Sequence, residues 1–217
     1  MSRREPTPRL PLAGRDERFP GFDVLDQSSS WDPATSSVVF ARLGRSPAVR
    51  FFDEHQEAVA TALFDQLLDQ REEPRVPVVQ MVDARLAEAQ TDGWHFDGMP
   101  RDQDAWPRTL AWLDRDSEEL WGVDFARAEW DDRARVLRQV QQLGAEPWHD
   151  WPATHTWSLW TRYACTAFYS HPYAWNEIGF AGPAYPRGYK NLGIDRREPF
   201  EVADHHPDDD PIQEWTR

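Results

Sequence analysis

The sequence has little positive charge and no long apolar stretch. Lys and Arg number 24 against 38 Asp and Glu, which gives a net charge of −14 at pH 7. A nucleic-acid surface needs clustered Lys and Arg, and an anionic membrane attracts basic segments. No run of about eighteen apolar residues, the length that spans a bilayer, is present. We therefore expect neither a nucleic-acid partner nor membrane insertion.

Cysteine is almost absent as well. Cys165 is the only one, so no disulfide can form within the chain. It lies in an apolar helical pattern, where we expect it to be a buried small hydrophobe. Arg3 and Arg4 are followed by charged residues and proline, not by the apolar segment of an export signal. We therefore expect a cytoplasmic protein.

The main pattern in the sequence is apolar residues spaced three and four positions apart. With 217 residues and twelve tryptophans the chain can bury a core. The spacing predicts helices, while the alternation typical of strands is nearly missing. We predict an all-α fold of about five helices, over about 53–69, 78–89, 104 onward, 131–143 and from 153 to the step before Pro172.

Composition divides the chain into three parts. Residues 1–49 are rich in Arg, Pro, Ser and Asp and are expected to form an extended N-terminal arm. Residues 50–200 form the helical domain, which ends in an irregular loop rich in Gly, Pro and aromatics. Residues 201–217 are expected to form an acidic flexible tail. The aromatic loop must pack against its own domain or against a partner.

Histidines suggest one catalytic alternative. His149 and His155 flank Asp150, and with nearby carboxylates they could serve a metal-assisted hydrolase that acts alone. Helical metal ligands normally stand three or four apart, and no H-E-x-x-H or paired cysteine motif occurs. The Gly179-x-x-Gly182 pair lacks the strand and helix of a dinucleotide loop. We assign no catalytic, cofactor-binding or metal-binding residue to the chain.

The aromatic loop permits a second alternative. Exposed rings can stack on sugars, so the chain could be a carbohydrate-binding module whose platform comprises Tyr173, Trp175, Tyr185 and Tyr189. Tryptophan and tyrosine are also enriched in cores and at the centres of protein interfaces. We favour a core or interface role for these rings over sugar binding.

Two strings in the last third of the chain carry a family resemblance. Thr166 to Pro172 reads TAFYSHP, and Trp175 to Pro183 reads WNEIGFAGP. Together with Leu113-Asp114, the segment Gly122–Ala126 and the helices after Phe52 and Asp131, they resemble the gluconate 2-dehydrogenase subunit 3 family over about residues 50–190. Members of that family commonly carry a twin-arginine signal and a Gly-Gly-Asn step before the tryptophan, and this chain has neither.

The resemblance implies a mostly helical, non-catalytic small subunit. Its partner would be a large flavoprotein of the glucose-methanol-choline type that oxidises sugars, glycosides or sugar acids, in some complexes with an electron-accepting cytochrome. FAD would belong to the partner, and this chain would bind no cofactor. The small subunit would support folding or flavin loading of the large one. The residues expected to contact the partner or to set the loop's path are His171, Tyr173, Trp175, Asn176, Gly179, Phe180, Gly182, Pro183 and Tyr189.

Overall fold

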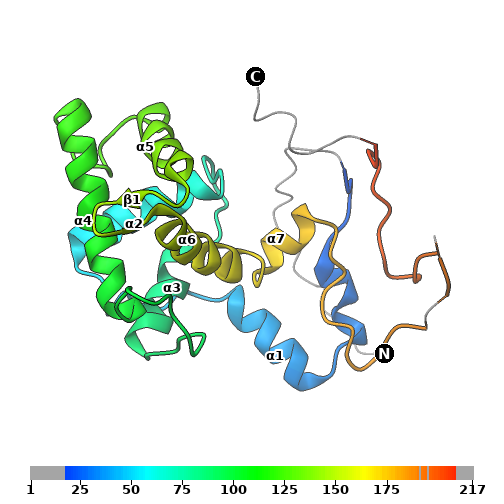
Figure 1. Cartoon of the computed structure of the whole chain (residues 1–217). Helices are drawn as coiled ribbons and strands as arrows, with labels where there is room; N and C mark the ends of the chain where they lie inside the picture. The colour runs from blue at the N-terminus through cyan, green and yellow to red at the C-terminus, as the bar shows by residue number, and fades with distance from the viewer. Residues whose placement is uncertain (1–17, 191, 195, 209–217) are drawn as a thin grey trace. The chain divides into compact units, whose positions relative to one another are not determined.

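The computed structural model describes residues 18–190, 192–194 and 196–208, and its regular structure is almost entirely helical (Figure 1). Among the described residues there are two short strands, β1 (Pro147–Trp148) and β2 (Trp151–Pro152), each two residues long. The all-α prediction is confirmed. The chain divides into two compact units. The core unit comprises residues 46–168, and the terminal unit comprises the described residues of 18–45 and 169–208.

The core unit contains five α-helices. They are α2 (Glu54–Leu67), α3 (Val78–Ala87), α4 (Asp102–Trp121), α5 (Trp130–Leu143) and α6 (Ala153–Phe168). Helix α2 begins with a capping box, in which Asp53 and Gln56 each accept a hydrogen bond from the other's backbone N–H. Helix α4 ends at Gly122, which adopts a left-handed φ of 73°. These helices match the five predicted ones, although α4 starts two residues earlier, which puts Pro107 past its first turn.

Trp106 of α4 lies at the centre of the core unit. Its side chain is fully buried, and its ring packs edge-on or tilted against three others, namely Phe52, Phe64 and Tyr163. On α6, Trp160 is also fully buried, and its indole N–H donates to the Thr109 hydroxyl at 3.1 Å. The Trp106–Tyr163 ring contact and the Trp160–Thr109 hydrogen bond thus join α4 to α6.

Asp83 joins the start of the core unit to α3. Its buried carboxylate accepts three backbone N–H bonds, from Arg50, Phe51 and Phe52, at 2.7 to 2.9 Å. A charged acceptor inside a protein is tolerated only when it is hydrogen-bonded in this way. The segment before α2 is therefore held in place even though it has no regular structure.

The terminal unit is built from both ends of the chain. The first end supplies the 3₁₀ helix η1 (Val24–Ser30) and helix α1 (Pro33–Arg42), and the second supplies α7 (Pro172–Glu177). Residues 24–42 were expected to be extended, and they are helical instead. Asp23 and Asp32 explain the difference, because each caps a helix N-terminus through its side chain. Pro33 then occupies the first turn of α1, where a missing N–H is harmless.

The structure describes part of the expected C-terminal tail. Of the expected flexible tail, residues 201–208 are described, and there Asp204 pairs with Arg18 while the His205 N–H donates to the Arg18 carbonyl. Residues 209–217 and the first seventeen lie outside the described part.

Cys165 is exposed on α6, so its predicted burial is wrong. None of the described helices is long and apolar enough to cross a membrane.

Candidate functional site

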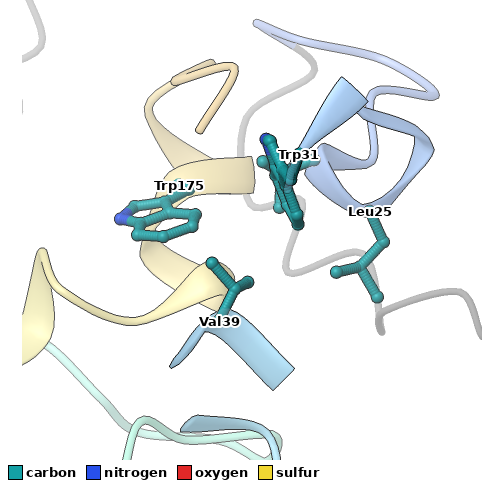
Figure 2. Close-up of a cluster of buried hydrophobic side chains, with 5 residues drawn as sticks. Leu25, Trp31, Val39 and Trp175 are labelled. Carbon is teal, nitrogen blue, oxygen red and sulfur yellow. The ribbon is translucent and has the colours of Figure 1, made fainter. Parts of the chain in front are cut away.

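Trp175 of α7 is buried in the core of the terminal unit. It clusters with Val24, Leu25, Trp31 and Val39, all from the N-terminal segment, and is 4% exposed (Figure 2). Its indole N–H donates to the Tyr169 carbonyl at 2.7 Å. The aromatic loop, expected to pack against its own domain or a partner, thus packs against the N-terminal segment.

His171 caps α7 from inside the terminal unit. The side chain is 2% exposed, and its Nδ1 accepts the Tyr173 N–H at 3.2 Å. Its Nε2 lies 2.9 Å from the Arg42 carbonyl, which can only accept, so Nε2 carries the proton. Burial lowers the pKa of His171 from 6.5 to about 4. The imidazole is therefore neutral at pH 7, as its accepting Nδ1 requires.

Arg42 completes this contact between α1 and α7. Its guanidinium donates to the Ser170 carbonyl at 2.6 Å and lies over the Trp175 ring at 5.9 Å from the centroid. Sequence reasoning missed Arg42 because its partners are about 130 residues away along the chain and no local pattern marks such a residue. Arg187 was missed for the same reason, and it donates to the side chains of Gln27 and Ser30.

Asn176 of the same motif also points inward. Asn176 is 8% exposed, and its side-chain oxygen accepts the Val24 N–H at 2.8 Å. This bond satisfies the first N–H of η1. Asn176 therefore fixes the N-terminal segment to α7.

A side chain at either glycine of the motif would clash with its neighbours. A Cβ on Gly179 would lie 2.5 Å from the Phe19 ring, and one on Gly182 would lie 2.8 Å from Trp31 and 3.0 Å from Val24. Both residues also adopt a left-handed φ, at 67° and 75°. Pro183, half-buried, follows directly. The motif Ile-Gly-Phe-x-Gly-Pro thus lets side chains of the N-terminal segment pack directly against its backbone within the terminal unit.

The other predicted contact residues lie at the surface. Phe180 is 40% exposed and Tyr189 is 56% exposed, while Tyr173 is half-buried against the Trp175 cluster. Further exposed apolar side chains belong to the same unit, and the contact prediction did not include them: Val38, Phe40, Tyr169, Ile178, Tyr185, Leu192 and Ile194. We call the exposed apolar residues from Tyr169 to Ile194 the apolar display.

The histidines of the hydrolase alternative have separate partners. His149 hydrogen-bonds to Asp116 at 2.8 Å and stacks on Trp112, whereas His155 stacks on Phe96 with ring centroids 4.0 Å apart. Within the described residues no three His, Cys, Asp or Glu side chains are grouped so as to hold a metal ion. The geometry gives that alternative no support.

Comparison with known proteins gives one match. A search of curated proteins and a search of solved structures each returned no significant match. The family model for gluconate 2-dehydrogenase subunit 3 matches residues 54–182, which is more than half of the chain and includes α2 to α7. The resemblance carried by the Trp175 to Pro183 motif is confirmed, and this chain belongs to the gluconate 2-dehydrogenase subunit 3 family.

Proposed function

We propose that this chain is a non-catalytic small subunit that binds a larger FAD-dependent dehydrogenase of sugars, glycosides or sugar acids and supports its folding or flavin loading. Membership of a dehydrogenase subunit family carries the proposal, because such a subunit implies a larger catalytic partner. The flavin and the reacting groups would then belong to that partner.

The apolar display supports this function and provides a surface for docking. It includes Tyr185 at 67% exposed, Tyr189 at 56% and Ile194 at 91%. Many exposed apolar side chains on one small unit are typical of a protein that binds a partner, and Tyr is enriched at interface centres. His171, Trp175 and Asn176, which are buried, would act by holding the segment that presents these residues.

Binding to only the folded partner explains the supporting role physically. A ligand that binds the native state and not the unfolded one raises the free energy of unfolding by mass action. If the docking surface exists only when flavin is bound, the same linkage favours the flavin-loaded form. No chemistry by the small subunit is needed.

Co-purification tests the proposal directly. We expect the tagged full chain, expressed in its native host, to retain a larger yellow protein at an equimolar ratio. Flavin absorbance and sugar-dependent dye reduction should be found in the complex and not in the isolated chain. Recovery of the chain alone, or turnover of a sugar by the isolated chain, would contradict the proposal.

Surface variants separate docking from folding. Replacing both Tyr185 and Tyr189 with Ala should weaken association by about 2 kcal/mol, because exposed rings at an interface centre carry much of its binding energy. The melting temperature of the free chain should change little, since both rings are exposed and Tyr189 loses only an edge-on contact with Phe200. Leu120→Ala, at an exposed apolar position of the core unit, is the control and should leave association unchanged.

A further inference from the structure

Four tryptophans of the core unit form a continuous row of ring contacts. The ring centroids of Trp112 and Trp148 lie 5.5 Å apart, and those of Trp148 and Trp160 lie 5.2 Å apart. Trp157 follows, with its centroid 6.4 Å from that of Trp160. We call these four residues the tryptophan array. The array lies within the core unit, and the proposed docking by the apolar display does not involve it.

The tryptophan array runs through the core unit and is partly exposed at both ends. Trp148 is 5% exposed and Trp160 is fully buried, whereas Trp112 and Trp157 are half-buried. A core needs apolar volume, which Leu or Phe also supplies, so packing alone does not select four indoles in contact. Tryptophan gives up one electron far more readily than phenylalanine, and an electron passes readily between rings in contact. A row that begins and ends at the surface can therefore conduct an oxidising equivalent through the unit.

Trp148 donates its indole N–H to a carboxylate. The bond to Asp116 Oδ2 is 2.7 Å long, and Asp116 Oδ1 lies 2.8 Å from His149 Nε2. An ionised carboxylate accepts on both oxygens, so His149 donates through Nε2. Trp160 differs, because its indole N–H donates to the neutral hydroxyl of Thr109. Of the two buried members of the array, Trp148 is thus the one bonded to a negatively charged group.

The Asp116 carboxylate favours oxidation at Trp148 over the other buried ring. An indole that has lost one electron is a strong acid, and its N–H proton transfers to a base within hydrogen-bonding reach. Asp116 is within that reach, at 2.7 Å. Its negative charge also lowers the free energy of a positively charged ring beside it. Once the proton has moved to Asp116, Trp148 is a neutral radical, and the oxidising equivalent cannot pass back to Trp160 unless the proton returns.

We propose that the tryptophan array accepts one-electron oxidation at the surface of the core unit and stores it as a neutral radical at Trp148. The oxidant is an oxygen-centred radical, such as the carbonate radical anion, which takes one electron from Trp112 or Trp157 and becomes carbonate. Trp148 replaces that electron through the array and transfers its indole proton to Asp116 Oδ2. A one-electron reductant such as ascorbate then restores Trp148, and the proton returns from Asp116 to the indole. The array thereby removes oxidising radicals, an activity that does not rest on the proposed docking function.

Photochemical oxidation of the full chain tests the proposal, with tris(bipyridine)ruthenium(III), generated by a light flash, as the one-electron oxidant. Dissolved oxygen adds to tryptophan radicals, so peptide mapping by mass spectrometry reports where the oxidation is stored. We expect Trp148 to be modified at least as much as the half-buried Trp112. Trp106 is the internal control, because it is fully buried and lies outside the array, and it should remain unmodified. Transient absorption should show a neutral tryptophan radical.

Asp116→Asn removes the base and keeps a hydrogen-bond acceptor for the indole. It should lower the modification of Trp148 by about tenfold, because the oxidised ring can no longer pass its proton to a carboxylate. The matched control is Asp114→Asn, two residues away on α4, where the carboxylate contacts His55 and accepts the Phe125 N–H. That variant should leave the modification of Trp148 unchanged.

Blocking both ends of the array gives a test that leaves Asp116 in place and remains valid if Asp116→Asn fails to fold. Trp112→Phe combined with Trp157→Phe changes two half-buried positions and keeps an aromatic ring at each. The modification of Trp148 should then fall to the level of Trp106, while circular dichroism shows that the fold is kept. An undiminished yield at Trp148 in this double variant would overturn entry through the array.

Three further results would contradict the proposal. Modification of Trp148 no greater than that of Trp106 in the native chain would overturn conduction to Trp148. An unchanged yield in a folded Asp116→Asn variant would overturn the role of the carboxylate. A tyrosyl radical at the buried Tyr163, whose hydroxyl donates to Asp102 at 2.7 Å, would overturn Trp148 as the site of storage.

Discussion

The two units of this chain distribute apolar and charged residues in opposite ways. The core unit has 23 acidic residues against twelve arginines, and it buries its large rings around Trp106 and Trp160. Of the thirteen exposed large hydrophobic residues in the described part of the chain, nine belong to the smaller terminal unit. One unit thus buries its large rings and carries most of the acidic charge, whereas the other exposes most of the large apolar side chains. The predictions below test this contrast, in order of expected effect.

Truncation of Trp106 should have the largest effect. Trp106→Ala removes a fully buried ring that contacts Phe52, Phe64 and Tyr163, and should lower the free energy of unfolding by about 4 kcal/mol. Denaturant unfolding, with hydrogen exchange resolved to residues 46–168, measures the loss. Leu120→Ala on the same helix is the control, and we expect it to change stability by less than about 0.5 kcal/mol. Equal effects of the two variants would remove the distinction between buried and exposed positions of α4.

Acid should weaken the terminal unit through His171. Because the folded pKa is about 4 and the usual value is 6.5, the unfolded chain takes up the proton first. The stabilising contribution is present above pH 6.5 and is lost as the pH falls to about 4, a change of about 3 kcal/mol. Amide exchange in residues 169–180, measured from pH 7 to pH 4, reports it.

The variant His171→Asn isolates this contribution, because Asn also caps helices and does not titrate. Its pH dependence should be flatter than that of the native chain by the same amount. His55 of the core unit has the opposite sign, since the neighbouring Asp114 raises its pKa. Its stabilising contribution is present below pH 6.5 and is lost as the pH rises through the raised value. Parallel acid responses in the two units would contradict this assignment.

Substitution of Gly182 should cost less. Gly182→Ala places a Cβ 2.8 Å from Trp31 at a φ of 75°, and we expect a loss of about 2 kcal/mol. Gly188→Ala separates the two causes, because Gly188 has a similar φ of 66° but no atom within 4 Å of the added Cβ. That variant should lose about 1 kcal/mol, the cost of the dihedral alone. Thermal unfolding monitored by near-ultraviolet circular dichroism compares the two, and equal losses would leave the steric explanation without support.

The smallest effect is expected at Cys165. Although it lies on α6, its side chain is exposed, so Cys165→Ser should change stability by less than about 0.5 kcal/mol. Partial desolvation by neighbouring residues raises the pKa of its thiol above the ordinary value even though the residue is exposed, so alkylation at pH 7 should be slow. A loss above 1 kcal/mol, measured by denaturant unfolding, would show that Cys165 contributes to the core after all.

The sequence predicted the core unit more fully than the terminal unit, for a physical reason. Helix α2 carries its own capping box at Asp53 and Gln56, and α4 ends at a glycine, so local signals suffice there. Helix α7 was missed because His171-Pro172 was interpreted as the end of a helix. The same pair is the cap and first turn of the next helix, since proline is excluded from helix interiors but favoured at their start.

The site was only partly predictable. The motif identified the correct segment, but it did not show that Trp175 and Asn176 face the chain's own N-terminal residues. Trp175 meets Trp31 and Val24 across more than a hundred residues, and no periodicity encodes such a pairing. The sequence does not distinguish the exposed Tyr189 from the buried Trp175, because both aromatic residues follow Gly or Pro residues in the same aromatic-rich segment.

The discontinuous make-up of the terminal unit has a consequence for synthesis. Residues 18–45 leave the ribosome first, yet Val24, Trp31 and Arg42 find their partners only after α7 has emerged. The core unit has all of its helices by Phe168 and can fold earlier, since domains generally form as they are translated. Phe180, Tyr185 and Tyr189 therefore become part of a formed surface only after α7 has emerged, later than the core unit.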